Sequence, residues 1–360
     1  MLIYVCNSAH GFGHGSRTAA VLTELAIRRP NWRLVLSTAL PEAFLRLAYG
    51  TLPIEHRCCR WDVGVIQADA LGCDPEATLV ALNTLRGALP ALVEREALWL
   101  EQQMEPVLVL ADVPPAAARL AERIRAPLVW LASFGWEAIY RPMGEAFQVW
   151  AEEAETLYRR GDRLISCPLA MPINWSVPRQ NVGLTAGRPR HTLADLRRRL
   201  ELPTERERCV LISFGGLGLA VPQELFRRWP NHVFIEPEPA LEGVTNGRRL
   251  PHDLRPLDLM PLCGRLITKP GYSSFCEAMS QGLAIHAVHR DGFAEAAVLE
   301  LALQHHGHQR LLSQGQLRQG DWELDQDPIP PLEGPLATDG AQAAAALLEG
   351  WVSDWFPGAL

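Results

Sequence analysis

The feature that most constrains the fold is a regular alternation of short apolar runs with helical stretches along almost all of the 360 residues. Such alternation is typical of parallel α/β architecture, in which helices cover both faces of a sheet and the strands are apolar throughout. The predicted strands are residues 2–7, 33–37, 54–60, 107–111, 128–132, 163–167, 210–214, 232–235, 266–268 and 283–288. The predicted helices include residues 16–29, 75–104 (broken before Pro90), 273–281 and 294–306, and residues 315–335 form a polar, proline-rich region.

The alternation stops once and then starts again, which divides the chain. Residues 168–190 are rich in proline, glycine and arginine and are predicted to form a linker. We therefore expect an N-terminal α/β domain over residues 1–167, a C-terminal one over residues 191–335, and a final helix within residues 336–360. Two domains also fit the length, because single cores rarely grow beyond roughly 250–300 residues. The expected architecture is two Rossmann-like parallel α/β domains that face a cleft.

Charge and cysteine content exclude several classes of protein. The net charge of −7 argues against nucleic acid or an anionic membrane as the main partner. No uncharged apolar run approaches the roughly 18 residues of a membrane-spanning helix. The eight cysteines are scattered without a C-x-x-C, which is typical of reduced thiols rather than of a disulfide framework or a zinc site. We therefore expect a soluble, cytoplasmic protein.

A glycine-rich loop, residues 10–17, follows the first predicted strand. Gly11 and Gly13 allow a tight turn and a close approach to a ligand, and the next helix points its positive end to the same place. The loop lacks the G-x-G-x-x-G spacing of dinucleotide-binding proteins, so no nicotinamide cofactor is expected. His14, inside the turn and with little reason to be buried, is a candidate general base. The alternative is a histidine that caps the helix or bonds a backbone carbonyl.

Lys269 is the only lysine, beside 33 arginines. Lysine gives a point charge on a slim stem where arginine gives a planar fork, so either a phosphate contact explains its retention or it is a surface residue kept by chance. It opens a segment in which Gly271, Ser273 and Ser274 start a helix, and the serines can cap that helix or donate to a phosphate. Glu277, one turn further, is a candidate partner for a ribose diol or, alternatively, a capping-box carboxylate for Ser274.

Two more strand ends in the second half carry suitable groups. One opens into Gly215-Gly216-Leu217-Gly218, which suits a phosphate or nucleoside, or is a simple tight turn. The other supplies Arg290 for a phosphate and Asp291 and Glu295 for sugar hydroxyls, unless Asp291 only caps the following helix.

In the first half, Asp112, Ser133 and Trp136 follow two predicted strands and are expected to line the opposite wall of the cleft. Trp136 can stack on a sugar or a base, although an aromatic residue at a strand end is more often core. The histidines at 305, 306 and 308 are interpreted as a solvated helix end, and no metal site is predicted.

Together these residues resemble the nucleotide-sugar glycosyltransferases of the GT-B fold. Residues 10–17 look like the acceptor-side loop of that superfamily. The run Lys269-Pro270-Gly271-Tyr272-x4-Glu277, followed by Arg290-Asp291-x-Phe293-x-Glu295, looks like its donor-side signature. Over most of residues 1–313 the chain is similar to the glycosyltransferase-like N-terminal region of plant L-arabinokinase, notably in residues 11–17, 66–71, 112–114 and 134–140. A sugar-kinase domain follows that region in arabinokinase and is not expected in these 360 residues, so kinase activity is not implied.

The resemblance implies transfer of a sugar from a nucleotide-diphosphate sugar such as a UDP-sugar to an acceptor hydroxyl. The predicted base is His14, with Asp112 as the second choice. The predicted acceptor-side residues are Gly11, Gly13, Arg17, Ser133 and Trp136. The predicted donor-binding residues are Gly215, Gly216, Lys269, Gly271, Ser273, Ser274, Glu277, Arg290, Asp291 and Glu295.

The nucleotide sugar is expected as a co-substrate, without a further cofactor or a metal ion, and a histidine base on the acceptor side favours inversion. Two alternatives remain open. One is a nucleotide-sugar epimerase of the same fold, which needs carboxylates such as Asp291 and Glu295 beside the donor sugar. The other is a non-catalytic protein that binds a sugar or a nucleotide.

Overall fold

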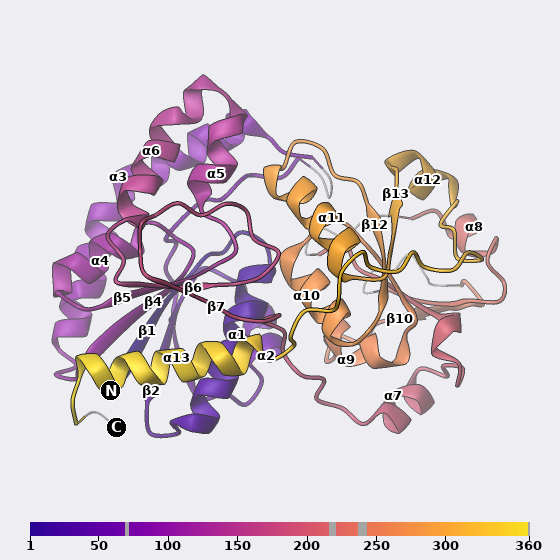
Figure 1. Ribbon diagram of the computed structural model, residues 1–360, viewed down its shortest axis with the longest axis horizontal. Helices are drawn as coiled ribbons and strands as arrows, with labels where there is room; N and C mark the ends of the chain where they lie inside the picture. The colour runs from indigo at the N-terminus through magenta and orange to yellow at the C-terminus, as the bar shows by residue number, and fades with distance from the viewer. Residues whose placement is uncertain (69–71, 216–220, 237–242, 359–360) are drawn as a thin grey trace. The chain divides into compact units, whose positions relative to one another are not determined.

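The computed structural model describes residues 1–68, 72–215, 221–236 and 243–358, and it divides into two compact units, each built on a parallel sheet (Figure 1). The first unit comprises Met1–Gln67, Cys73–Thr185 and Ala337–Leu360, and the second consists mainly of Ala186–Leu336. The predicted pair of Rossmann-like α/β domains is confirmed.

The sheet of the first unit has the strand order β3-β2-β1-β4-β5-β6-β7, and its strands pair in parallel. Its strands are β1 (Leu2–Asn7), β2 (Arg33–Ser37), β3 (Ile54–Arg57), β4 (Val107–Asp112), β5 (Leu128–Ala132), β6 (Arg163–Ser166) and β7 (Arg179–Asn181). Its helices are α1 (Gly13–Arg28), α2 (Glu42–Tyr49), α3 (Pro75–Glu101), α4 (Ala117–Ile124), α5 (Trp136–Tyr140), α6 (Gln148–Tyr158) and α13 (Gly340–Trp355). In β1 every residue is buried, and the register aligns Asn7 with Asp112 at the carboxyl ends of β1 and β4.

The sheet of the second unit has the strand order β10-β9-β8-β11-β12-β13, again with parallel pairing. Its strands are β8 (Cys209–Ile212), β9 (Val233–Glu236), β10 (Gly247–Arg249), β11 (Arg265–Thr268), β12 (Ala284–Val288) and β13 (Gln309–Leu312). Its helices are α7 (Leu193–Arg199), α8 (Gln223–Phe226), α9 (Pro256–Leu259), α10 (Tyr272–Ser280), α11 (Ala294–His306) and α12 (Gln314–Gln319).

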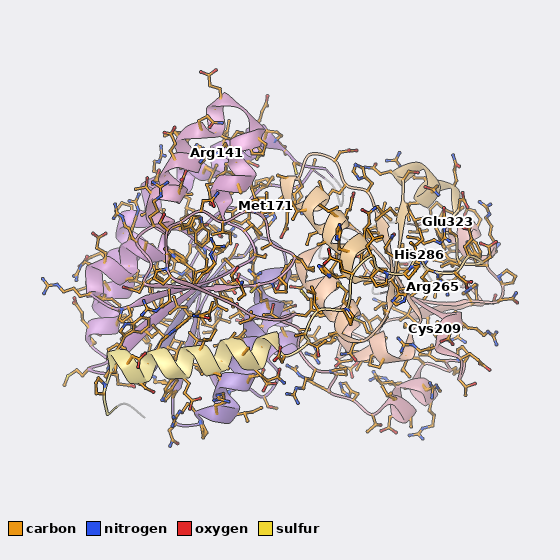
Figure 2. The ribbon with its side chains drawn as sticks, viewed as in Figure 1. Arg141, Met171, Cys209, Arg265, His286 and Glu323 are labelled. Atoms are coloured by element: carbon orange, nitrogen blue, oxygen red, sulfur yellow. The ribbon has the colours of Figure 1, made fainter. Side chains whose placement is uncertain are left out.

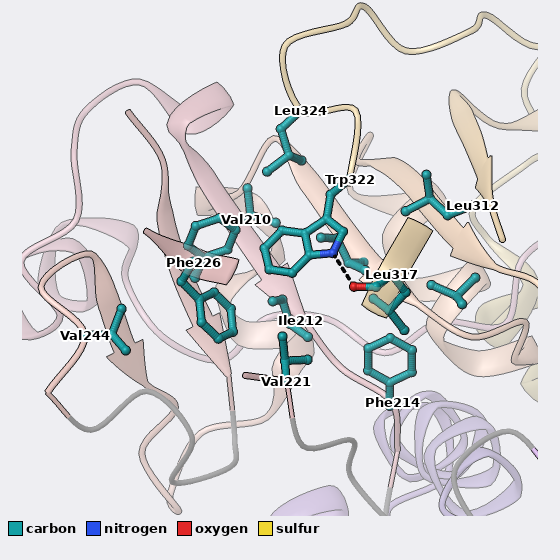
Figure 3. Packing of buried hydrophobic residues seen from close by; sticks show 13 residues of the cluster. Val210, Ile212, Phe214, Val221, Phe226, Val244, Leu312, Leu317, Trp322 and Leu324 are labelled. Carbon is teal, nitrogen blue, oxygen red and sulfur yellow. Dashed lines mark hydrogen bonds between the residues drawn. The ribbon is translucent and has the colours of Figure 1, made fainter. Parts of the chain in front are cut away.

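One face of the second sheet is closed by Trp322 (Figure 3). The indole packs among apolar side chains of the strands and of α8, such as Val210, Ile212 and Phe226, and donates a hydrogen bond to the carbonyl of Leu317 at 3.1 Å. The region predicted to be polar and proline-rich therefore supplies a central core residue of this unit.

The long helix α3 runs through Pro90 without the expected break. Proline removes one backbone hydrogen bond and crowds the preceding turn. Here the turns on both sides are anchored in the core, with Leu82 buried before the proline and Ala97 and Leu100 after it. Packing on each side keeps the helix continuous where the sequence pattern alone indicates an end.

Two boundaries differ from the sequence-based ones. Residues 168–185 belong to the first unit, where β7 extends the sheet next to β6. β7 is a short, exposed edge strand of polar residues, so it has no apolar run to reveal it. The final helix α13 also belongs to the first unit, where it packs against α1 (Figure 1).

Within the described ranges, none of the helices combines the length and the apolar character that crossing a membrane requires.

Candidate functional site

The carboxyl ends of β1, β4 and β5 meet at one edge of the first sheet, because these strands are neighbours. The loop after β1 turns at Gly11, whose φ of +65° lies in the left-handed region that favours glycine. The helix α1 then begins at Gly13, earlier than the predicted residue 16. His14 consequently lies in the first turn of the helix and is buried, so the expectation of an exposed histidine in the loop is wrong.

His14 and Asp112, the two predicted catalytic residues, form one pair. The distance from His14 Nδ1 to Asp112 Oδ1 is 2.7 Å, and Asp112 is completely buried at the end of β4. Burial by itself would raise the pKa of Asp112, but the charge and hydrogen bonds of Arg17, followed by those of His14, hold it at about 2. The ionised carboxylate can only accept, so we assign the proton to Nδ1 of the imidazole, which leaves the lone pair on Nε2.

Arg17 occupies the other side of Asp112. Its Nε donates to Oδ2 at 2.8 Å, a terminal nitrogen donates to Oδ1, and the other terminal nitrogen donates to the hydroxyl of Ser133 at 2.9 Å. The hydroxyl of Thr18 donates to Oδ2 at 3.0 Å. His14, Arg17 and Thr18 are spaced i, i+3 and i+4 along α1, so one face of the helix carries all three to the end of β4.

Trp136 is completely buried, as the core alternative expects. Its ring centroid lies 6.2 Å from that of His14, and its indole N–H donates to Asp62 Oδ2 at 2.8 Å. The hydroxyl of Ser8 donates to the other oxygen of Asp62 at 3.0 Å. Sequence reasoning did not find Asp62. The only feature of the sequence that could have indicated Asp62 is its position shortly after a predicted strand.

An apolar pocket of about 60 Å³ lies in the first unit beside Trp136. Its wall includes Trp61, Asp62, Trp136 and Tyr140, together with Leu82 and other side chains of α3 and α6. Asp62 and Trp136 thus belong both to this wall and to the surroundings of His14.

In the second unit, β8 and β11 are neighbours and bring the turn after β8 next to Lys269. Gly215 has a φ of +79°, and a Cβ built on it would lie 3.9 Å from Cε of Lys269. The lysine side chain therefore lies along this turn, as a shared phosphate site requires. Gly216, the next predicted residue, lies outside the described residues.

Gly271 is the N-cap of α10, and the helix begins at Tyr272. Ser273 and Ser274 are therefore inside the first turn, and neither forms the predicted side-chain cap. The alternative for Glu277, a capping box with Ser274, is likewise absent from this helix. The serines keep the position that matters for an anion, because the first turn presents backbone amides and the positive end of the helix.

Glu277 lies in the next turn of α10 and keeps partial exposure to solvent. Burial raises its pKa to about 7, with the charge of Arg255 opposing that rise and that of Asp258 adding to it. A carboxyl that titrates near neutrality both donates and accepts hydrogen bonds, which suits a diol.

The segment after β12 places its three predicted residues differently. Arg290 and Glu295 are buried, and the guanidinium of Arg290 lies 4.3 Å from the ring centroid of Phe293. The side chain of Asp291 is 80% exposed and lies 3.2 Å from Nε2 of His289. The alternative that Asp291 caps α11 is wrong, because Phe293 is the N-cap and no side chain bonds there.

His305 and His306 end α11 and keep contact with solvent, as expected for a helix end, but they also have partners. His305 Nδ1 lies 2.8 Å from Glu333 Oε1, and His306 Nδ1 lies 3.2 Å from the carbonyl of Gly334. A segment far along the chain supplies these partners, which the local sequence could not show. In the part of the chain that the structure describes, no cluster of three or more His, Cys, Asp or Glu side chains is placed to hold a metal ion.

No protein-family model matches this chain. It is similar to L-arabinokinase of Arabidopsis thaliana, with 27% identity over 307 residues, which are 82% of this chain and 29% of that protein. The chain thus spans less than a third of the length of this relative, and the expected similarity to it is confirmed.

Solved structures of plant glycosyltransferases share the fold. Arabidopsis thaliana UGT89C1 superposes with a TM-score of 0.62 at 12% identity, covering 99% of this chain and 95% of that one. Phytolacca americana UGT2 in complex with UDP-2fluoro-glucose and pterostilbene superposes with a TM-score of 0.61 at 14% identity, covering 98% and 99%. Medicago truncatula UGT71G1 with UDP-glucose gives 0.58 at 12% identity, covering 98% and 95%. The chain therefore has the two-domain GT-B fold of these enzymes, and it resembles in sequence a limited part of L-arabinokinase.

Proposed function

We propose that the protein is a glycosyltransferase that moves a sugar from a nucleotide-diphosphate sugar to an acceptor hydroxyl. The observation that carries the proposal is the buried hydrogen bond of 2.7 Å between His14 and Asp112 at the carboxyl edge of the first sheet. An imidazole whose Nδ1–H is held by an ionised carboxylate has the tautomer and orientation of a general base. Pairs of histidine and carboxylate also occur in proteins with other functions. The proposal therefore also requires a donor site, which we place in the second unit.

The donor site that we propose lies in the second unit, around Lys269. Charge develops on the diphosphate as it leaves the sugar, and fixed positive groups aimed there lower the barrier. Lys269 beside Gly215 and the first turn of α10 with Ser273 and Ser274 supply such groups. Glu277 is assigned to the ribose, Arg290 to a phosphate, and Asp291 and Glu295 to the donor sugar.

In this mechanism Nε2 of His14 removes the proton of the acceptor hydroxyl, and the acceptor oxygen attacks the anomeric carbon as the nucleoside diphosphate leaves. Direct attack inverts the anomeric centre. Positive side chains and a helix N-terminus take the place of a metal ion at the diphosphate. The apolar pocket beside Trp136 is our candidate for the acceptor.

Two further assignments rest on comparison and composition. Solved neighbours of the same fold hold UDP-2fluoro-glucose, UDP-L-rhamnose or UDP-glucose, which supports a uridine diphosphate donor. The scattered cysteines support a cytoplasmic location.

The first test is nucleotide-sugar binding. Thermal shift with a panel of nucleotide sugars should identify a donor, and Lys269→Ala should weaken its affinity tenfold or more, in line with the roughly 1.5–3 kcal/mol of a hydrogen bond to a charged group. Arg227→Ala, which removes an exposed positive charge from the same unit, is the matched control. Equal affinities of Lys269→Ala and the wild type would reject the donor site.

The second test is transfer. His14→Asn keeps a nitrogen donor for Asp112 but has no basic nitrogen, so it should lose at least 99% of transfer activity while donor affinity stays unchanged, since general bases contribute about 10²–10⁴-fold. Parallel loss of donor binding would argue against the base role. A wild-type protein that binds the donor but transfers to none of a broad set of acceptors would favour the non-catalytic alternative. Interconversion of the donor sugar without an acceptor would favour the epimerase.

A further inference from the structure

The charge of Asp112 is already matched before His14 accepts a proton. Arg17 and His14 share Oδ1 of Asp112, and Arg17 also holds Oδ2 at 2.8 Å. Arg17 is 2% exposed and Asp112 is 0% exposed, so this ion pair is shielded from water. A proton on His14 would add a second buried positive charge to a pair that is neutral, and an unmatched buried charge is costly.

A second buried carboxylate stands beside the same pair. Asp62 is 5% exposed, and its two oxygens accept hydrogen bonds from Ser8 and Trp136, which are neutral donors. Both donors also touch the pair. The backbone N–H of Ser8 donates to the carbonyl of Asp112 at 2.8 Å, and the ring of Trp136 lies 6.2 Å from that of His14.

We propose that Asp62 is a positioning residue that balances the positive charge His14 acquires as the base, because Arg17 already neutralises Asp112. With His14 protonated, two cations then face two carboxylates, and the buried cluster is neutral. The inference rests on the proposed function in one respect, that His14 is the base. The charge balance between His14, Arg17, Asp62 and Asp112 is a property of the protein without substrate.

Burial and hydrogen bonds act in opposite directions on the pKa of Asp62, and the net shift is upward. Burial raises its pKa, while the hydroxyl of Ser8 and then the charge of His14 lower it. The other ionisable groups that interact with Asp62 or Asp112 come from β1, α2, α5, α6 and the loop after β3, and they are Cys6, Tyr49, Tyr140, Tyr158 and Arg60. Burial raises the pKa of Cys6, Tyr49, Tyr140 and Tyr158 well above their ordinary values, so all four stay neutral. Arg60 is exposed, so water and salt screen its charge.

His10 contacts the cluster through Trp136, with a distance of 5.1 Å between the ring centroids. Its Nδ1 accepts from the backbone N–H of Val65 at 3.3 Å.

The test is a pH titration of His14 in the full chain, monitored by NMR of labelled histidine rings. The spectrum of His14→Asn assigns the His14 signal. Asp62→Asn keeps the shape of the side chain and removes its charge. We expect the titration midpoint of His14 to fall by about one pH unit, a tenfold change in proton affinity. Glu42→Gln, which removes an exposed charge of the same unit, should leave the midpoint unchanged. A folded Asp62→Asn variant with the wild-type midpoint would overturn the proposal.

A second measurement needs no variant. The carboxyl carbon of Asp62, followed in wild-type protein with labelled aspartate, should report an ionised side chain throughout the pH range in which His14 takes up its proton. A protonated Asp62 under those conditions would overturn the charge balance.

Transfer kinetics separate this inference from the proposed function. Asp62→Asn should lower kcat about tenfold with donor affinity unchanged, and the acidic limb of the pH–rate profile should move with the His14 midpoint. A wild-type protein without transfer activity would reject the proposed function, and the NMR titrations would then decide the role of Asp62 alone.

Discussion

His286 shows how strongly single buried groups in this protein depend on their surroundings. It lies in β12 with 0% exposure, its Nδ1 bonds the carbonyl of Trp322 at 2.8 Å, and its Nε2 has no partner among the described residues. Figure 2 labels it together with Arg265 in the second unit. Burial lowers the pKa of His286 to about 4, opposed by the bond to Trp322 and aided by the charges of Arg265 and Arg310.

This pKa predicts an acid-sensitive second unit. The unfolded chain takes up a proton at this histidine below about pH 6.5, whereas the folded chain resists until about pH 4. The contribution of neutral His286 to the free energy of unfolding is therefore fully present above pH 6.5. It is lost as the pH falls towards 4, by about 3 kcal/mol in total. Urea unfolding of wild-type protein and of His286→Asn, at intervals between pH 4 and 8, measures the difference.

His286→Asn keeps a donor for the carbonyl of Trp322 but does not titrate, so its stability should vary less with pH than that of the wild type. His308→Asn, at an exposed position, is the control and should retain the wild-type pH dependence. Equal pH dependence in the wild type and His286→Asn would contradict the assignment.

Glu96 ties the helix α3 to the sheet of the first unit. It is 1% exposed and accepts hydrogen bonds from Tyr4 of β1 at 2.8 Å, from Arg57 of β3, and from Arg95 at 2.8 Å. Burial alone would raise the pKa of Glu96, but its bonds to Arg57, Arg95 and Tyr4 lower it to about 2. The helix is therefore fixed by a buried carboxylate as well as by its apolar face.

Removing this carboxylate should destabilise the first unit. Glu96→Ala leaves the buried hydroxyl of Tyr4 and two guanidinium groups with fewer partners, and we expect a loss of about 3 kcal/mol in the free energy of unfolding. Glu94→Ala on the same helix is the matched control, because its ion pair with Arg123 is exposed and should contribute less than about 1 kcal/mol. Similar losses in the two variants, measured by urea unfolding, would contradict a special role for Glu96.

At the scale of the molecule, the first unit is assembled from distant parts of the chain. α13 packs against α1, and it buries Ala341, Ala344, Ala345, Leu348 and Val352. The backbone N–H of Leu184 also donates to the carbonyl of Ala337 at 2.7 Å. The end of the sequence thus completes the unit that its beginning starts.

Truncation after Leu336 should therefore weaken the first unit rather than the second. Loss of the apolar surface buried by α13 should cost the first unit roughly 5 kcal/mol. Hydrogen exchange would show faster exchange in β1 and β2 while β11 and β12 stay protected. Glu349→Ala, which removes only partly exposed ion pairs with Arg28 and Arg29, should leave β1 and β2 protected. Uniform loss of protection in both units would contradict the assignment of α13.

The sequence alone was enough for the central strands of the two parallel sheets, because these strands are apolar runs that stand out between helices. It did not predict the edge strands β10 and β13 of the second sheet. It also indicated His14, Asp112 and Lys269 as chemical candidates, since each follows an apolar run near a turn. The edge strand β7 was missed because its three residues are exposed and polar. The Pro90 break was wrongly predicted because local preference gave no weight to the packing of α3 on both sides.

What only the tertiary structure decided is which candidates act on one another. His14 and Asp112 are far apart in the chain, and they meet because β1 pairs with β4 and because α1 starts at Gly13 with its His14, Arg17 and Thr18 face towards that strand end. Neither the pairing of β1 with β4 nor the ion pair between Arg17 and Asp112 can be recognised from the local sequence. Asp62 became visible only through its bonds to Ser8 and Trp136. Residue type and spacing determine which chemistry is available, whereas long-range strand pairing determines which charges share one buried site.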